Sequence, residues 1–111
     1  MRTINRSAIV VRPAQPFLDW LHQVDPTSID MTLHDLGKEP SIYLLPEYDD
    51  VEATRVLAKF SKTIFEEELE GWWTERSSWP RRLGMSKFLK WFEFSFHSMI
   101  FDACTGTLKR E

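Results

Sequence analysis

Cysteine and long apolar runs are scarce in this chain. The single cysteine, Cys104, excludes an internal disulfide and any multi-cysteine metal site, and it indicates a reducing compartment. The apolar run that begins at Ala8 is interrupted at Arg12, far short of the length of a signal peptide or a membrane span. We therefore expect a cytoplasmic protein with no membrane anchor.

An excess of positive charge is also absent. The 111 residues contain 14 Lys and Arg against 17 Asp and Glu, a formal net charge of −3, so nucleic-acid binding is disfavoured. The chain has 42% hydrophobic residues, 14% aromatic residues, and only 4 Gly and 6 Pro, a composition typical of a folded protein. Its length fits a single domain over residues 1–111.

Catalytic and cofactor motifs are missing as well. The glycines are isolated, so no phosphate-binding loop is present, and no serine lies in a Gly-x-Ser-x-Gly sequence. The histidines are too far apart in sequence to form a local pair of metal ligands. We therefore assign no catalytic residue, no metal site and no cofactor.

Hydrophobic periodicity predicts two strands in the first half of the chain. A β-branched run predicts a strand from about Thr3 to Val11 that is buried on both faces near its end. Residues 41–45 are apolar at alternate and intervening positions and lie between Pro40 and Pro46. This pattern favours a short strand in the interior of a sheet.

A third strand is expected near the C-terminus. Residues 92–98 alternate strictly between aromatic and polar side chains, and an apolar run continues the segment to Phe101. The alternative is one helix over residues 86–103, because Phe88, Phe92 and Phe96 also keep helical spacing. We prefer the strand, since the two-residue alternation is cleaner.

Helical periodicity marks three segments. The first follows Pro13 and covers residues 16–24, the second is a long helix that ends near Gly71, and the third is a short helix over residues 86–91. Residues 71–80 contain three Trp, two Ser and one Pro without a clean period. This composition predicts an irregular loop between the last two helices.

Two capping signals locate further helix starts. Thr32 followed by Asp35 predicts a capping box on a single helical turn that stops at Gly37. Asp49 followed by Glu52 predicts the start of the long helix, with acidic charge at the positive end of its dipole.

These elements predict one α+β domain with the order β-α-β-α-α-β. The connection between the first two strands is long enough for a right-handed parallel crossover, so we expect a small three-stranded mixed sheet with helices packed on one face. Such a sheet has two open edges, which favours a homodimer.

Two groups of residues are candidates for binding. Tryptophan and arginine are common at binding hot spots, and they gather in the loop and the basic segment after it: Trp72, Trp73, Trp79, Arg81 and Arg82. The alternative is that the indoles fill the core and the charges form solvated faces. The second group is polar and lies near the predicted strand ends: Glu47, Glu93 and His97, with Arg81 nearby.

Several short strings together carry a family resemblance over nearly the whole chain. They are Ile4-Asn5-Arg6, Tyr43-Leu44-Leu45-Pro46-Glu47, Trp79-Pro80, Trp91-Phe92 and His97-Ser98-Met99. In these strings the chain resembles a family of small uncharacterised bacterial proteins of about this length. The resemblance implies a bacterial origin, and it implies no activity, because none is assigned to the family.

The sequence therefore favours a non-enzymatic interaction or regulatory module with a protein partner. The alternative is a small-molecule-binding protein or minor enzyme with a polar site near the strand ends. Nucleic-acid binding through the basic segment 76–90 ranks third.

Overall fold

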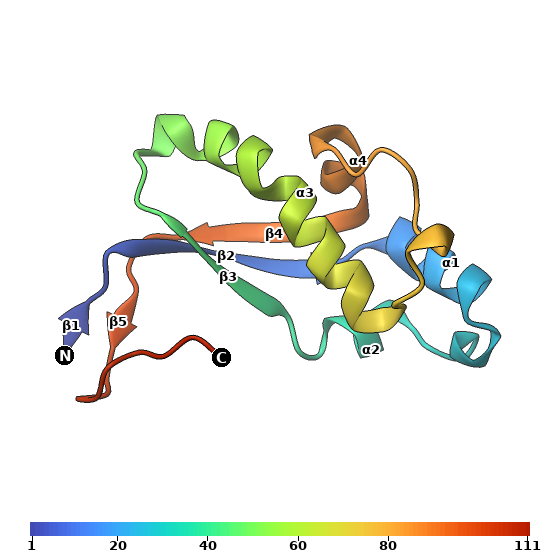
Figure 1. Ribbon diagram of the computed structural model, residues 1–111, viewed down its shortest axis with the longest axis horizontal. Coiled ribbons are helices and arrows are strands. Elements are labelled where there is room, and N and C mark those ends of the chain that lie inside the picture. Colours follow the sequence, from blue (N-terminus) through green and yellow to red (C-terminus); the bar gives the residue numbers. More distant parts are fainter.

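The centre of the fold is a three-stranded antiparallel sheet (Figure 1), seen in a computed structural model that describes residues 1–111. The middle strand β2 (Arg6–Pro13) pairs with β3 (Ser41–Pro46) on one side and with β4 (Phe92–His97) on the other. Both pairs are antiparallel, so the predicted mixed sheet is wrong. The chain turns back through two helices beyond the end of β2, and this return reverses the direction of β3.

The four α-helices occupy two positions around this sheet. Helices α3 (Ala53–Trp72) and α4 (Met85–Trp91) lie over one face, whereas α1 (Gln15–Val24) and α2 (Leu33–Gly37) lie beyond the end of β2 (Figure 1). The three helical segments predicted from periodicity and the predicted helical turn are confirmed. No helix is both long enough and apolar enough to cross a membrane. The α+β class is confirmed.

The C-terminal segment changes from helix to strand at a single residue. Helix α4 ends at Trp91 and strand β4 begins at Phe92, so the alternative of one helix over residues 86–103 is wrong. The backbone N–H of Phe92 still donates to the carbonyl of Phe88, while its side chain starts the strand alternation. The two-residue period was therefore the decisive signal.

An irregular break divides the first and third predicted strands. Strands β1 (Arg2–Thr3) and β5 (Phe101–Asp102) form a separate antiparallel pair. Between the partner pairs Thr3–Phe101 and Ala8–His97, one side has four intervening residues and the other has three. The two strand pairs therefore do not continue in one register, and Figure 1 shows β1 and β5 turning away from the main sheet.

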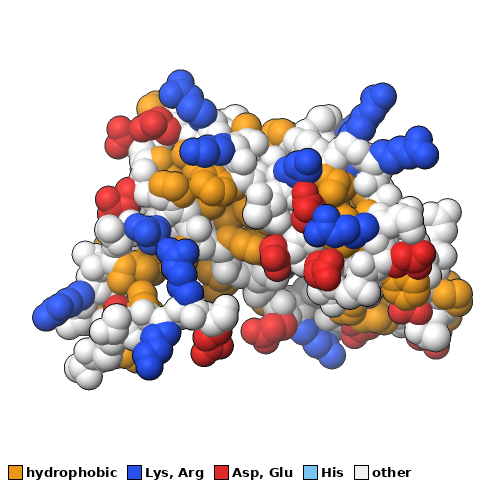
Figure 2. Space-filling model, viewed as in Figure 1, with side chains coloured by type: hydrophobic (Ala, Val, Ile, Leu, Met, Phe, Trp, Pro, Cys, Tyr) orange, Lys and Arg blue, Asp and Glu red, His pale blue; other side chains and the backbone are white.

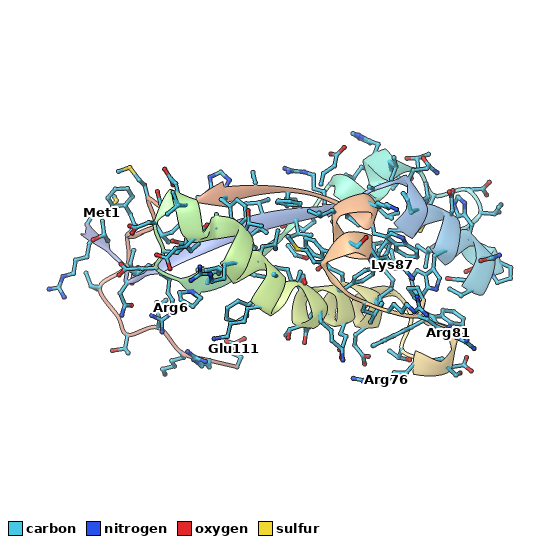
Figure 3. The ribbon with its side chains drawn as sticks, turned by 90° about the horizontal axis from the view of Figure 1, so that it is seen from above. Met1, Arg6, Arg76, Arg81, Lys87 and Glu111 are labelled. Atoms are coloured by element: carbon cyan, nitrogen blue, oxygen red, sulfur yellow. The ribbon has the colours of Figure 1, made fainter.

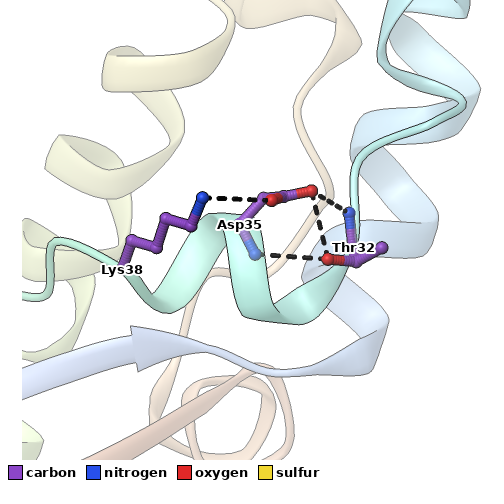
Figure 4. A network of polar contacts seen from close by, with 3 residues as sticks. All are labelled: Thr32, Asp35 and Lys38. Carbon is purple, nitrogen blue, oxygen red and sulfur yellow. Dashed lines mark hydrogen bonds and ion pairs between the residues drawn. The ribbon is translucent and has the colours of Figure 1, made fainter.

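The predicted capping box at the start of α2 is confirmed (Figure 4). The backbone N–H of Asp35 donates to Thr32 Oγ1 at 3.2 Å, and the N–H of Thr32 donates to the Asp35 carboxylate at 2.9 Å. These hydrogen bonds from Thr32 lower the pKa of Asp35. Lys38 Nζ lies 3.7 Å from the same carboxylate. Local sequence is therefore sufficient to start this short helix.

The start of α3 differs from its prediction. The Asp49 side chain makes no capping hydrogen bond, and a 3₁₀ turn over Asp50–Glu52 precedes the α-helix. The turn brings the N–H of Glu52 to the carbonyl of Asp49 at 2.8 Å. The 3₁₀ turn thus satisfies backbone groups that a side-chain cap was expected to satisfy.

The hydrophobic core lies between the sheet and α3. Ile9 and Val11 of β2 have no exposed surface and face the core cluster, as strand alternation requires. Aromatic rings from four elements fill the space around Phe65, which contacts Phe88 and Phe92 edge to face with centroids 6.3 and 5.0 Å apart.

Strand β3 is an edge strand, so its predicted interior position is wrong. Leu45 is 2% exposed, but Ile42 and Leu44 on the opposite face are 65% and 52% exposed. No element of the fold is hydrogen-bonded to the outer edge of β3. Apolar side chains on both faces of this segment therefore did not indicate that both faces are buried.

Candidate functional site

The polar residues predicted near the strand ends do not form one site. Glu93 lies opposite Arg12 at one end of β2, while Glu47 follows Pro46, which lies opposite Arg6 at the other end. Six residues of extended strand separate these levels, about 20 Å. The antiparallel sheet, with a strand between β3 and β4, keeps the two carboxylates apart.

Glu93 and His97 do share the uncovered face of β4, as strand alternation predicted. Both are exposed, and His97 Nε2 lies 2.9 Å from Ser95 Oγ between them. The imidazole therefore contacts a hydroxyl, and no carboxylate orients it.

The indoles of the predicted loop are divided between core and surface. Trp73 and Trp79 pack against the core cluster, and Trp79 Nε1 donates to the Trp73 carbonyl at 2.7 Å. Trp73 Nε1 is buried without a hydrogen-bond partner. The Arg76 guanidinium lies 4.9 Å from the centre of the Trp79 ring. Both indoles therefore contribute to packing at the edge of the core.

The predicted arginines lie on the surface of the segment before α4. Arg81 and Arg82 are both exposed, and Arg82 has a positive φ of 58°. The Arg81 carbonyl accepts a hydrogen bond from Lys87 Nζ. Figure 3 shows Arg81 and Lys87 at one end of the molecule and Arg6 at the other. The basic segment is thus remote from Glu47.

Trp72 is the indole that lies in a cleft. It is 37% exposed and, as the last residue of α3, borders a cavity of about 220 Å³ between α3, the segment before β3 and β3 itself. We call this cavity the acidic notch. Its lining is Pro13, Leu36, Glu39, Ser41, Tyr43, Glu67, Glu68, Gly71 and Trp72.

A tyrosine and a buried carboxylate join the two walls of the acidic notch. Tyr43 Oη donates to Glu68 Oε2 at 2.5 Å, and Glu68 is only 8% exposed. Burial raises the pKa of Tyr43 well above its usual range, and the hydrogen bond to Glu68 raises it further. The hydroxyl therefore stays protonated at neutral pH and acts as a hydrogen-bond donor.

The acidic notch carries three carboxylates and no cation. Glu39, Glu67 and Glu68 all line it, whereas the two ion pairs of the chain join Lys38 to Asp35 and Arg76 to Glu66. Red side chains gather near the middle of Figure 2, over the C-terminal half of α3.

The geometry of these carboxylates suits an organic cation. No group of three or more acidic, histidine or cysteine side chains in the chain converges closely enough to hold a metal ion. An ammonium or guanidinium group is larger and donates hydrogen bonds to carboxylates that lie further apart, and the Trp72 ring adds a cation–π surface. Tyr43 donates its hydroxyl proton to Glu68, and the carboxylates of the notch are hydrogen-bond acceptors for such a cation.

Sequence reasoning missed Tyr43 and Glu68. A signal was present, because Glu68 follows Ile64 by four residues and therefore lies on the apolar stripe of the long helix. Tyr43 lies two residues before Leu45, so strand alternation puts both on the covered face. A carboxylate within an apolar stripe requires a partner, and Tyr43 supplies it.

A larger cavity of about 780 Å³ lies where the β1 and β5 pair meets the main sheet. It is lined by Thr3, Ile4, Asn5, Arg6, Leu44, Leu108, Lys109 and Arg110. Three of these side chains are cationic, none is acidic, and none takes part in an ion pair. This basic cavity and the acidic notch have opposite charge.

No protein-family model, curated protein or solved structure matches this chain. The resemblance to small bacterial proteins therefore stays a prediction, and the candidate site depends on geometry and charge.

Proposed function

We propose that the protein is a non-enzymatic interaction module that receives a lysine or arginine side chain of a partner protein in the acidic notch. The observation that carries this proposal is the state of Glu68. This carboxylate is more than nine-tenths buried, accepts one hydrogen bond from Tyr43, and has no cationic partner in the chain. An inserted cation completes the arrangement.

Desolvation makes Glu68 the carboxylate of the notch that would interact most strongly with a bound cation. A buried carboxylate has lost most of its hydration, and a single neutral hydrogen bond replaces only part of it. A cation that enters the notch from outside interacts with this carboxylate at a lower effective dielectric than it would at an exposed site. Glu39 and Glu67 at the exposed rim attract the same cation as it approaches.

The size of the acidic notch favours a single side chain. Its volume of about 220 Å³ is below the range of about 300–1,000 Å³ that small-molecule sites usually have. A lysine or arginine side chain also has an aliphatic stem, and Leu36 and Trp72 provide apolar surface for it. The partner supplies the remaining contact area outside the notch.

A titration of the full chain with an oligolysine peptide tests the proposal. Amide and indole resonances followed by NMR are expected to shift at Tyr43 and Trp72. The Glu68→Gln variant keeps an acceptor for the Tyr43 hydroxyl but loses the charge, so it is expected to weaken binding about tenfold or more.

The matched control is Glu70→Gln. Glu70 is on the same helix but lines a different surface depression, beside Thr63 and Arg76. Equal weakening by Glu68→Gln and Glu70→Gln indicates unspecific attraction to α3 and contradicts the proposal. Binding of a free alkylamine without binding of the peptide indicates a small-molecule site instead.

The basic cavity favours a second candidate function, the binding of a small anionic ligand. Its volume of about 780 Å³ lies in the range of small-molecule sites, and Arg6, Lys109 and Arg110 all border it. Thermal unfolding with a panel of short-chain carboxylates and phosphates tests this candidate. A rise in melting temperature that Arg6→Gln removes supports it.

A further inference from the structure

The outer edge of β4 has unpaired backbone groups at known positions. The N–H of Ala14 donates to the Trp91 carbonyl at 2.7 Å, which makes Ala14 and Trp91 a hydrogen-bonded pair. Such pairs recur at every second residue of an antiparallel ladder. Glu93, Ser95 and His97 therefore direct their backbone groups toward β2, while Phe94 and Phe96 direct theirs outward.

The two edges of the sheet differ in how they are protected. Strand β3 ends at Pro46 and follows Pro40, and proline at an edge removes a donor that another strand needs. Strand β4 contains no proline, and it is hydrogen-bonded only to β2. In Figure 3, no ribbon runs along the outer side of β4 over most of its length. The β4 edge is therefore the one that accepts a further strand.

The side chains of β4 are complementary to those of a second, antiparallel copy of the same strand. An antiparallel pair of two β4 strands centred on Ser95 puts Glu93 of each copy opposite His97 of the other. The two Ser95 side chains then meet on the symmetry axis. Centring the pair on Phe94 puts Glu93 opposite Ser95, and centring it on Phe96 puts Glu93 opposite Met99, so neither register pairs Glu93 with an imidazole. A cross-strand contact between the Glu93 carboxylate and an imidazole N–H thus favours the register centred on Ser95.

Backbone geometry agrees with the same register. A pair centred on Ser95 makes Phe94 of one copy a direct partner of Phe96 of the other, and these are the residues whose N–H and C=O groups point outward. Each Phe94–Phe96 pair exchanges two hydrogen bonds. On the covered face the same pairs bring four phenyl rings side by side, which favours aromatic cross-strand contacts.

Exposed apolar residues lie at both ends of the strand. Leu89, in the last turn of α4, is 51% exposed, and Met99, after the end of β4, is 74% exposed. Antiparallel pairing brings the start of one β4 beside the end of the other. Leu89 of one copy and Met99 of the other therefore come to the same end of the interface, where burial of both adds to the contact.

We propose that β4 pairs with β4 of a second copy of this chain, centred on Ser95, to form a homodimer with a continuous six-stranded sheet. This surface is separate from the acidic notch, so it adds to the proposed function and does not depend on it. The symmetric edge leaves both notches of the dimer free for a partner.

Sedimentation of the full chain over a range of concentrations tests this homodimer. Wild type is expected to show a monomer–dimer equilibrium. Ser95→Lys puts two like charges on the symmetry axis and is expected to raise the dimer dissociation constant about tenfold or more. Ile42→Lys adds the same charge at the β3 edge and is expected to leave the constant unchanged. A wild-type chain that stays monomeric at every concentration overturns the proposal, as does a dimer that Ile42→Lys weakens and Ser95→Lys does not.

Charge reversal tests the register. Glu93→Lys is expected to raise the dissociation constant about threefold to tenfold, and the double variant Glu93→Lys with His97→Glu is expected to restore it. Failure of the double variant to restore the dimer overturns the register. Hydrogen exchange gives an independent readout, since the Phe94 and Phe96 amides are expected to become protected only as concentration rises.

Discussion

The two faces of the sheet differ although they are made by alternate residues of the same strands. On the covered face, Leu45 packs into the core and is 2% exposed. On the uncovered face its neighbour Leu44 is 52% exposed. Figure 1 shows α3 and α4 over the other face of the sheet. Two adjacent leucines therefore have different roles: Leu45 stabilises the core, whereas Leu44 contributes apolar surface that is exposed to solvent.

The two faces contribute unequally to the stability of the fold. The covered face buries apolar area from α3, α4 and all three strands of the main sheet, so it is the main source of folding free energy. The uncovered face and its edges bury little in the monomer, and their side chains are free to contact other molecules. The acidic notch lies at the border, with Glu68 buried from the core side and Trp72 exposed on the other.

Replacing the two leucines gives the largest contrast. Leu45→Ala is expected to lower the free energy of unfolding by about 2–5 kcal/mol, because it leaves a cavity in a closely packed core. Leu44→Ala is expected to change it by less than about 1 kcal/mol, since the side chain is half exposed. Urea unfolding measures both, and Leu57→Ala in α3 is expected to resemble Leu45→Ala. Similar values for Leu44 and Leu45 would contradict the assignment of the two faces.

Removing the Tyr43 hydroxyl has a smaller effect. Tyr43→Phe leaves the buried Glu68 without its hydrogen bond and is expected to lower the free energy of unfolding by about 1–3 kcal/mol. The control is Tyr48→Phe, because the Tyr48 hydroxyl makes no hydrogen bond to another residue, and a change within about 0.5 kcal/mol is expected there. Equal effects of the two replacements would show that the Tyr43–Glu68 contact is unimportant for folding.

The same tyrosine makes stability depend on alkaline pH. Its pKa is raised in the folded state, so below its ordinary value of about 10 the hydroxyl is protonated in both states and the stabilisation is complete. Above about pH 10 the unfolded state loses the proton first, and stability falls as the pH rises. Tyr43→Phe is expected to reduce this decline, whereas Tyr48, whose pKa burial also raises, retains its own part. The test is to measure the free energy of unfolding of wild type and Tyr43→Phe below and above pH 10. An equal decline in both would contradict the role of Tyr43.

The smallest expected effect lies outside both faces, at the start of α2. Thr32→Ala removes the side-chain half of the capping box and is expected to lower the free energy of unfolding by about 1 kcal/mol. Thr32→Ser keeps the hydroxyl and serves as the control. A loss from Thr32→Ser as large as that from Thr32→Ala would assign the effect to the methyl group instead of the cap.

Local sequence was sufficient wherever a few neighbouring residues decide the structure. Thr32 and Asp35 interact over three residues, so the capping box could be predicted from their spacing alone. The alternation of phenyl and polar residues after Trp91 likewise predicted β4, because strand geometry repeats every two residues. Asp49 shows the limit of this approach, since a 3₁₀ turn satisfied the same backbone groups by another route.

Long-range relations could not be predicted in the same way. The parallel crossover was wrong because it depends on where α1 and α2 lie relative to the sheet, and no local pattern specifies that position. The pairing of Tyr43 with Glu68 joins residues 25 positions apart, and Glu47 and Glu93 are separated by the direction in which their strands run.

The sequence alone thus determined which segments form the main helices and strands. Periodicity and capping involve residues only a few positions apart, so they can be recognised from neighbouring side chains. Only the tertiary structure decided which strand is central, which edges stay open and which carboxylate is buried. These properties depend on how the apolar faces of separate elements pack against one another, and the free energy of that packing is shared over the whole core.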